Sequence, residues 1–523
     1  RWSGASLEVD SGSPRAVALR LADLLEAHPS MPQSTARLTC SLALFLAGLS
    51  ASLASAATRY VDASLATGAN DGTSWADAYR GPQALATAMS AAVSGDEIWV
   101  AAGTYTASPT SRTASHILRN GVTVLGGFAG GEASAEERDV LANECTMSGD
   151  LLGNDTASNT SRTDNSYHVI TVLTGSTAVL DGFTVRAGYA NSSTSNRDRG
   201  AGIICLSNHS PTIRNCRFID NRCTFGGGAG YVNGSAPKFL FCDFIDNVGG
   251  AYGGAFDCAG AGAVTFESCR FFGNTAARAG ALEFFVSQPR VTNCLFVGNV
   301  STGSGGGGAI WLGNGSSGTL RNLTVVGNSS NVTAGAIYNT GGTTTIANSI
   351  VWGNTGPGTV QQDGVRSAGG TTSVTWSCIQ GGASGSTNFA ADPLFADEAD
   401  GDYRLSIASP CIDAGANGSV PSGVTTDLDG NPRFVDVPEV PDTGSGAPPI
   451  VDLGAYEFQV EPNPCPADLD GDGVVGPSDL AILLSAWGET GGKSGPPLAD
   501  LDGDGVVGAG DLAILLSAWD SCG

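Results

Sequence analysis

Short runs of alternating apolar and polar residues recur between residues 200 and 360, and they repeat one seven-residue phrase. The first complete copy is Asn215-Cys216-Arg217-Phe218-Ile219-Asp220-Asn221. The Asn that closes the phrase advances by 26, 27, 25, 29 and 26 residues, which gives a column of six: Asn221, Asn247, Asn274, Asn299, Asn328 and Asn354. A period of this length indicates stacked structural repeats.

A second column runs in step with the first and places an Ala beside a Gly: Ala201, Ala229, Ala255, Ala281, Ala309 and Ala336. Each repeat contains short runs of Phe, Ile and Val that are divided by Gly and Asn, which is typical of strands. None has a helical stripe of ten residues, and propeller blades need about 40 residues. The pattern therefore predicts an all-β fold, a right-handed parallel β-helix over residues 115–380 with three strands per turn.

Gly and Asn suit the corners of such a solenoid because both tolerate left-handed backbone. Stacked Asn amides are expected to hydrogen-bond from coil to coil. A third column, Cys216, Cys242, Cys269 and Cys294, has neither zinc-site spacing nor a His partner, so we interpret it as a buried stack of small side chains. Rungs about 4.8 Å apart also fit the Cα range of a disulfide, so one or two oxidised rungs remain an alternative.

The segments before the repeat predict a cap and a secretion signal. An Ala-rich helical stretch, residues 83–93, precedes a strand at 94–100, and we expect this helix to cover the open end of the solenoid. Residues 31–57 have a signal-peptide pattern, with Arg37, an apolar run from Leu38 to Leu53, and the small residues Ala54-Ser55-Ala56. We interpret residues 1–30 as an upstream extension or artefact, and 58–460 as the β-helix domain.

Two loops close to the C-terminus, Asp468–Asp479 and Asp500–Asp511, are nearly identical. Each has Asp at positions 1, 3, 5 and 12, Gly at position 6 and Val at position 7, as in an EF-hand calcium loop. Without a cation the carboxylates would repel one another, so the pattern predicts two bound calcium ions. The predicted ligands, with both Val contributing carbonyls, are Asp468, Asp470, Asp472, Val474, Asp479, Asp500, Asp502, Asp504, Val506 and Asp511.

A helical run follows each loop, and the ligand at position 12 is Asp where EF-hands usually have Glu. These features make residues 465–523 similar to dockerins, calcium-folded modules that bind cohesin domains. The resemblance implies a module over 461–523, a cohesin-like or cell-surface partner, and a disulfide between Cys465 and Cys522. The module carries Lys493 but lacks the late-helix basic residues of many dockerins. The partner-reading positions would be Pro477, Ser478, Leu484, Ser485, Ala509, Gly510, Leu516 and Ser517.

Four phrases after residue 390 resemble those of pectate-lyase-like right-handed β-helices, bacterial surface proteins that end in varied anchors. They are Ala391–Phe395, Ser409–Gly415, Asp427–Arg433 and Asp452–Glu457. The resemblance implies no catalytic residues. Asp427–Asn431 also matches the first half of a calcium loop, but position 12 would be Pro438, whose side chain cannot bind metal.

Composition limits the function classes. Of 523 residues 75 are Gly, about twice the usual share, and the net charge is −25. This acidity disfavours nucleic acid and anionic lipid as partners and suits a secreted or cell-surface protein that binds cations. With 41% apolar residues the chain can form a core, and beyond the signal no run is long enough to span a membrane.

The sequence shows no clear catalytic cluster in the solenoid. Asp220 and Asp246 share one slot of adjacent coils, and the other charged candidates and the remaining histidines are scattered: Asp243, Glu267, Glu283, Arg270, Arg290, His116, His168 and His209. We therefore expect no metal or nucleophile site in the β-helix, which would bind or scaffold polysaccharide or surface components. The alternative is a polysaccharide-active enzyme, a lyase or glycoside hydrolase, carried by its dockerin.

Overall fold

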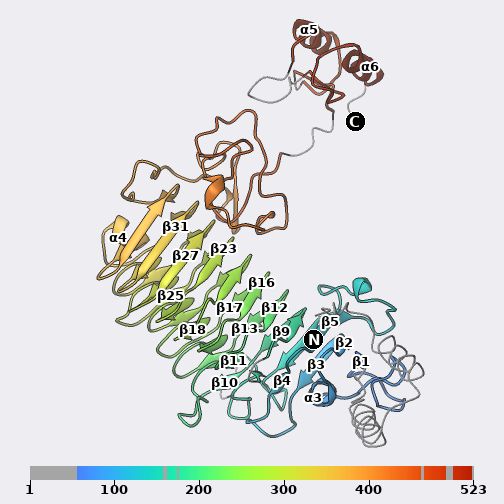
Figure 1. The fold of residues 1–523 in the computed structure, drawn as a ribbon, viewed down its shortest axis with the longest axis vertical. Helices are drawn as coiled ribbons and strands as arrows, with labels where there is room; N and C mark the ends of the chain where they lie inside the picture. Colours follow the sequence, from blue (N-terminus) through green and yellow to red (C-terminus); the bar gives the residue numbers. More distant parts are fainter. Residues whose placement is uncertain are drawn as a thin grey trace, which may run out of the picture. The chain divides into compact units, whose positions relative to one another are not determined.

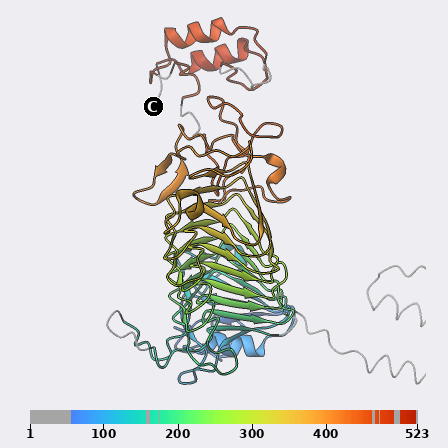
Figure 2. The same cartoon turned by 90° about the vertical axis from the view of Figure 1, so that its left-hand side faces the viewer.

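The computed structural model describes residues 56–156, 162–173, 176–460, 465–470, 472–490 and 499–520. The extension predicted at 1–30 and nearly all of the signal predicted at 31–57 lie outside these residues. Across the described part, strands stack coil on coil into three long sheets in which every pairing is parallel (Figures 1 and 2). The predicted parallel β-helix is thereby confirmed.

Sheet A is the longest, with eleven strands in the described residues. Its order is β1 (Thr58–Val61), β2 (Glu97–Ala101), β5 (Thr123–Phe128), β8 (Val179–Asp181), β12 (Thr212–Arg214), β16 (Lys238–Leu240), β19 (Thr265–Glu267), β23 (Arg290–Thr292), β27 (Ser317–Arg321), β31 (Thr343–Ala347) and β34 (Thr371–Thr375).

Sheets B and C complete each coil. Sheet B orders β3 (Gly103–Thr106), β6 (Cys145–Ser148), β9 (Phe183–Arg186), β13 (Arg217–Ile219), β17 (Asp243–Ile245), β20 (Arg270–Phe272), β24 (Leu295–Val297), β28 (Thr324–Val326), β32 (Ile350–Trp352) and β35 (Cys378–Ile379). Sheet C runs through β4 (His116–Leu118), β7 (Ile170–Val172), β11 (Ile203–Leu206), β15 (Gly230–Asn233), β18 (Phe256–Ala259), β22 (Leu282–Phe285), β26 (Ile310–Leu312), β30 (Ile337–Asn339) and β33 (Val365–Ser367).

Shorter elements decorate the coils. One small parallel sheet joins β10 (Tyr189–Ala190) to β14 (Arg222–Cys223), and another joins β21 (Thr275–Ala276), β25 (Val300–Ser301) and β29 (Ser329–Ser330). The remaining elements before the C-terminal module are η1 (Ala135–Glu137), α4 (Val360–Gly364), η2 (Asn417–Ser419) and the antiparallel pair β36 (Phe395–Asp397) and β37 (Asp402–Leu405).

The core of the β-helix is a stack of aromatic rings held in register by sheet B. Phe218 pairs with Phe244, Phe244 with Phe271, and Phe271 with Phe296 on successive strands. The ring centroids of these pairs lie 5.4, 4.8 and 4.5 Å apart, and the rings stack. All four side chains are fully buried, so one apolar column runs along the inside of four coils.

The closing Asn column forms the predicted amide ladder. In each coil the side-chain amide donates to the side-chain oxygen of the Asn in the next coil, from Asn221 through Asn354, over distances of 3.1, 3.0, 2.9, 2.8 and 2.9 Å. The same oxygen also accepts the backbone N–H of the preceding Asn, as between Asn247 and Asn221. These bonds satisfy amides that are otherwise buried, which explains why the period is marked by Asn.

The Cys column is a buried stack of free thiols, as the main interpretation predicted. Cys216, Cys242, Cys269 and Cys294 are fully buried, and none is oxidised. Each thiol donates to the carbonyl oxygen two residues earlier, for example from Cys216 to Arg214 at 3.1 Å. Burial raises the pKa of Cys216 well above its usual value, so this thiol stays protonated. The alternative of oxidised rungs is therefore wrong in this structure.

Helix α3 (Ala84–Ala91) covers the first coils, as the Ala-rich stretch predicted (Figure 1). It contacts β1, β2, β3 and β4, and its buried residues Leu85, Ala88 and Met89 join the main core. The helix replaces the missing preceding coil, because its apolar face covers side chains that would otherwise meet water.

After β35 the chain leaves the regular coils but stays attached to them. Asn348 bonds to the backbone of Ala416 in both directions, at 2.9 and 3.0 Å, and its carbonyl accepts the N–H of Gly454 at 2.9 Å. Leu453 and Ile412 pack in a second apolar cluster with Ile350. The phrases after residue 390 thus complete the end of the same core.

Charged residues of these phrases form a buried network within the segment. The Asp427 carboxylate accepts the backbone N–H of Glu457 at 3.1 Å, and the Asp452 carboxylate accepts that of Asp413 at 2.8 Å. Arg433, fully buried, donates to the carbonyl of Asp452 at 3.2 Å. Each charge therefore organises backbone rather than facing solvent.

The C-terminal module, described by itself, is built on two short helices, α5 (Pro477–Ser485) and α6 (Ala509–Ser517). Leu483 and Leu515 are fully buried in its own apolar cluster, together with Val475 and Val507 from the two loops. The loops and helices are linked reciprocally: Val507 donates to the carbonyl of Glu489, and Asp520 donates to that of Val475. The two nearly identical sequences thus produce a nearly symmetric pair.

Candidate functional site

The first acidic loop of the C-terminal module is already folded into a compact turn. The Asp468 carboxylate accepts the N–H of Gly473 at 2.9 Å, and the Asp470 carboxylate accepts that of Asp472 at 3.1 Å. Asp479, fully buried, receives the N–H of Leu469 at 2.6 Å. Because the carboxylates hold the backbone of their own loop, their side chains point toward one another.

The second loop repeats this geometry. Gly505 donates to Asp500 at 3.0 Å, and Asp504 donates to Asp502 at 3.1 Å. Asp511 is buried and receives the N–H of Leu501 at 2.5 Å. The matching hydrogen bonds show that the two loops, whose sequences are nearly identical, also have the same local structure.

Carboxylate oxygens of the predicted ligands gather within 4.8 Å of one another in both loops. The first group is Asp468, Asp470 and Asp479, and the second is Asp500, Asp502 and Asp504. A buried oxygen of Asp500, Oδ1, has no hydrogen-bond partner. An orphaned carboxylate oxygen among other carboxylates fits a hard cation with oxygen ligands.

Four predicted ligands fall outside these two groups, namely Asp472, Val474, Val506 and Asp511, whereas Asp504 belongs to the second. Asp472 and Asp504 each accept the N–H of the following Val, at 2.9 Å in both loops. The side chains of Val474 and Val506 are exposed, which leaves their backbones as the relevant atoms.

The predicted disulfide is only half within the described residues. Cys465 is disulfide-bonded and buried in the module core. Its predicted partner, Cys522, lies outside the part of the chain that the structure describes.

The positions that the dockerin resemblance assigns to partner reading are all exposed. Leu484 and Leu516 stand out because these large apolar side chains are 53% and 51% exposed at matching places on α5 and α6. Ser485 and Ser517 follow them, and each hydroxyl donates to the carbonyl three residues earlier at 2.7 Å. The module thus presents the same exposed apolar side chain at matching places in its two halves.

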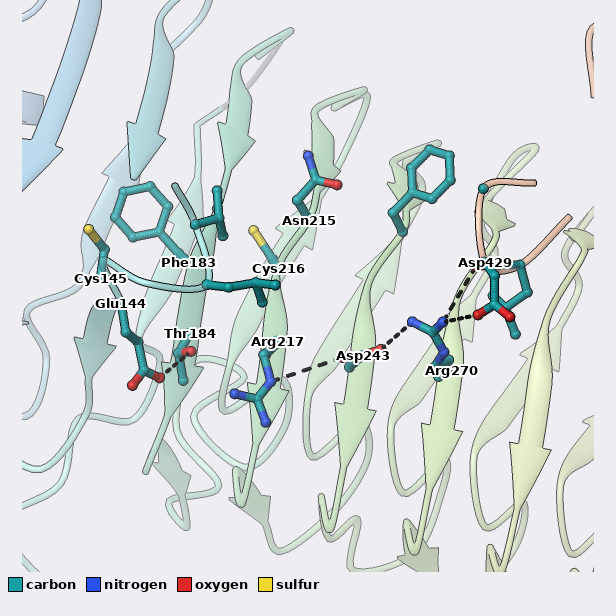
Figure 3. Close-up of a pocket in the computed structure, with 16 residues that line it drawn as sticks. Glu144, Cys145, Phe183, Thr184, Asn215, Cys216, Arg217, Asp243, Arg270 and Asp429 are labelled. Atoms are coloured by element: carbon teal, nitrogen blue, oxygen red, sulfur yellow. Dashed lines mark hydrogen bonds and ion pairs between the residues drawn. The ribbon is translucent and has the colours of Figure 1, made fainter. Parts of the chain in front are cut away.

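A separate groove lies on the outer face of sheet B (Figure 3). Its cavity measures about 530 Å³, and Arg217, Asp243 and Arg270 stand in a row along it on three successive strands. Asp429, from the segment after the coils, closes one side through an ion pair of 3.1 Å with Arg270. The later segment lines the groove through Leu428–Gly430, and Val140, Leu141 and Glu144, which precede strand β6, line it as well.

The charges in the groove alternate in sign. The Asp243 carboxylate lies 4.0 Å from the Arg217 guanidinium and 3.7 Å from that of Arg270. Burial raises the pKa of Asp243, although both arginines oppose the shift. Arg217, with its side chain 49% exposed, remains accessible to a ligand. Alternating donors and acceptors suit a polar chain of hydroxyl groups better than a polyanion.

A second row of charge, on sheet C, is closed to ligands. Asp257 and Glu283 are paired residues of neighbouring strands, but they are only 4% and 2% exposed. Burial raises the pKa of Asp257 to about 6. Burial also raises the pKa of Glu283 to about 8, and repulsion from Asp257 contributes to this shift. Arg278 forms an ion pair with Glu283, and the backbone of Gly226 lies over Asp257. Two neighbouring carboxylates thus occur, but without the access that a glycosidase needs.

The other sequence candidates do not form one site. Asp220 forms ion pairs with Arg162 and Arg222, and the side chains of Glu267 and Arg290 are on sheet A. His116 is fully buried, and burial lowers its pKa to about 4. Within the described residues these groups lie on or beside different sheets and do not converge on one point.

Arg217 and Asp257 were not singled out from the sequence, and Asp429 was noted only as part of the half calcium loop Asp427–Asn431. The repeat pattern contained a signal for Arg217 and another for Asp257. Arg217 follows the Cys column directly, at the same place as Asp243 and Arg270, and Asp257 stands two residues after the Ala column, as Glu283 does. Asp429 had no such signal, because its place in the groove depends on a contact between distant segments.

Comparison with protein families now assigns the parts. Residues 466–518 match the dockerin type I domain, and residues 151–329 match the right handed beta helix region. The C-terminal module is a dockerin type I domain. Dockerin domains of this type bind calcium and have cohesins as partners. In this chain the dockerin follows a right-handed β-helix.

Comparison with solved structures gives distant likenesses. A rhamnogalacturonan lyase is 14% identical, with a TM-score of 0.37, covering 68% of this chain and 95% of its own. A pectate lyase is 15% identical, with a TM-score of 0.28, covering 78% and 98%. No curated protein matches the sequence. None of the helices in the described residues has the length and apolar character needed to cross a membrane.

Proposed function

We propose that this chain is a secreted or cell-surface protein in which a polysaccharide-binding β-helix, residues 58–460, is tethered by its dockerin, residues 461–523. The observation that carries the tether is the pair of exposed apolar positions, Leu484 and Leu516, on two matching loop–helix units. The cohesin or surface partner would cover one of them. The −25 net charge agrees with an extracellular setting that supplies calcium.

Two calcium ions complete the tether in this proposal, one in each loop. The ligands would be the carboxylates of Asp468, Asp470, Asp472 and Asp479 with the Val474 carbonyl, and their counterparts Asp500, Asp502, Asp504, Val506 and Asp511. The support is the convergence of these carboxylates and the orphaned oxygen of Asp500. Calcium would neutralise the loops and so stabilise the helices that present the docking positions.

The tether is tested by fusing residues 461–523 to an unrelated carrier protein. The fusion is expected to attach to a cohesin, or to the source cell surface, in calcium and to detach in chelator. Because the two helices present the same feature, Leu484→Asp or Leu516→Asp alone should leave attachment within about threefold. The double variant should lose it by more than about 100-fold, since a charge would enter each apolar contact. Surface plasmon resonance measures both changes.

The matched control is Leu483→Met, which changes a buried leucine of α5 without altering the surface. Attachment of the truncated chain 58–460 with equal strength and without calcium would contradict the tether and assign attachment to the solenoid.

The groove on sheet B is the proposed polysaccharide site of the β-helix. Its support is the accessible Arg217 in a cavity of about 530 Å³ with alternating charges. A second candidate function, polysaccharide cleavage in the same groove, rests on the same side chain. Arginine stays protonated in proteins, so Arg217 would act there by stabilising the negative charge that develops on a uronic-acid unit, and a separate base would take the proton.

We expect the full chain to bind soluble neutral or sparsely charged polysaccharide and Arg217→Ala to weaken this binding about tenfold, because an accessible donor of the groove is lost. Arg290→Ala, on sheet A, is the control and should bind like the parent. Affinity electrophoresis measures binding, and an assay for unsaturated or reducing ends in the same samples measures cleavage. Cleavage product that the parent forms and Arg217→Ala does not form would show that the chain is a polysaccharide-cleaving enzyme. Equal binding by both variants would exclude the groove.

A further inference from the structure

A third group of carboxylates lies far from the dockerin loops in sequence, in the segment that follows the regular coils. Oxygens of Asp413, Asp436 and Asp442 all lie within 4.8 Å of one another. Two oxygens that bind one calcium ion at about 2.4 Å are at most about 4.8 Å apart, and these three carboxylates meet that condition. Asp436 and Asp442 reach solvent, which gives an ion a path of entry.

Asp413 is the observation that points to a ligand. Its side chain is fully buried, and neither carboxylate oxygen has a hydrogen-bond partner of ordinary geometry. The charged groups that act on it, Asp452, Asp442 and Asp436, are all acidic. The backbone N–H of Val437 favours the charged form of Asp413, but no cationic side chain is among the groups that act on it. A buried carboxylate with so little compensation is costly unless something positive occupies the space beside it.

The backbone around the group places the other two carboxylates. Val437, next to Asp436, is buried in the apolar cluster of this segment. Thr443, next to Asp442, donates its N–H to the Asp413 carbonyl at 3.0 Å, and Gly444 does so at 2.9 Å. Both ends of the loop 436–444 are therefore anchored, and each anchor sits beside one acidic side chain.

We propose that Asp413, Asp436 and Asp442 bind a calcium ion that fixes the loop 436–444 to the segment following the β-helix. All the ligands are hard oxygens, with no His or Cys, which excludes the usual donor set of zinc. The irregular loop suits calcium, whose coordination is flexible, better than the strict octahedron of magnesium.

This site differs from the half calcium loop in the same segment, Asp427–Asn431, which the sequence analysis considered an incomplete match. The half-loop Asp427–Asn431 uses its first carboxylate to accept the N–H groups of Asp429, Asn431 and Glu457. The carboxylate oxygens of Asp427 therefore accept hydrogen bonds from the backbone. The site also departs from our expectation that the part before the dockerin contains no metal site, because its three ligands share no sequence motif.

The test counts calcium ions bound to the full-length chain by equilibrium dialysis in a tenfold excess of magnesium. Asp436→Ala/Asp442→Ala should bind one ion fewer than the parent, with unchanged near-ultraviolet circular dichroism, because both side chains are at the surface. Glu398→Ala/Asp400→Ala removes the same charge from an exposed turn of the same segment and should bind as many ions as the parent.

A second measurement locates the ion. Calcium should protect the exposed Glu439 from a glutamate-specific protease at least tenfold in the parent, and not in Asp436→Ala/Asp442→Ala. Dockerin variants Asp472→Ala and Asp504→Ala should keep this protection, which separates the site from the tether. Equal ion counts in parent and double variant, loss of the ion to magnesium, or protection that follows the dockerin variants would each overturn the proposal.

Discussion

Removing calcium should unfold the dockerin while leaving the β-helix intact. Each loop holds four predicted carboxylate ligands with few cations nearby, and the module core is small, centred on Leu483, Leu515, Val475 and Val507. Such a core cannot offset the repulsion within both loops, so metal binding and folding are coupled. In chelator the far-ultraviolet signal of α5 and α6 should disappear, whereas the β-sheet signal persists.

Single variants divide this effect between the loops. Asp472→Ala and Asp504→Ala should each reduce the calcium bound by residues 461–523 by about one ion, since each loses a ligand from a different loop. Glu489→Gln, an exposed acidic residue outside both loops, is the control and should bind like the parent. Isothermal titration gives the number of ions. Helix content that is unaffected by chelator, or a titration without heat, would refute coupled folding.

The solenoid was predictable because each repeat of the sequence forms one coil of the structure. From Asn221 to Asn328 each buried Asn donates its amide both to the next Asn and to a backbone carbonyl of the preceding coil, so one chemical requirement recurs at each period. The Cys column was predictable as a buried stack for the same reason. The oxidation state of the Cys column was not predictable, because the spacing of the rungs permits a disulfide. In the structure each thiol points toward a carbonyl of its own coil and forms no disulfide.

The groove and the third acidic group could not be predicted, because both depend on contacts between distant segments. Arg270 and Asp429 are 159 residues apart in sequence and meet only when the chain turns back after the last coil. Asp413 meets Asp436 and Asp442 through a loop whose course is set by one buried valine and two backbone hydrogen bonds. No spacing rule describes such a fold-back, whereas the dockerin ligands lie within twelve consecutive residues.

Replacing Phe244 by Asp should be the most damaging single change in the β-helix. The Phe244 ring is fully buried and stacks on Phe218 and Phe271 at 5.4 and 4.8 Å, so the variant loses both contacts and buries a charge without a partner. Loss of a buried Phe costs about 3–5 kcal/mol, and the charge adds to it. Since a whole domain is stable by about 5–15 kcal/mol, the variant should fail to fold or melt far below the parent.

Two comparisons make this prediction specific to the interior column. Phe244→Leu keeps the site apolar and should cost about 1–2 kcal/mol, visible as a small shift in the denaturation midpoint. Phe285→Asp places the same charge at a phenylalanine that is 41% exposed on sheet C, and it should change stability by less than about 1 kcal/mol. Chemical denaturation followed by circular dichroism ranks the three variants. Equal midpoints for Phe244→Asp and Phe285→Asp would mean that the predicted register, and with it the inward direction of the Phe column, is wrong.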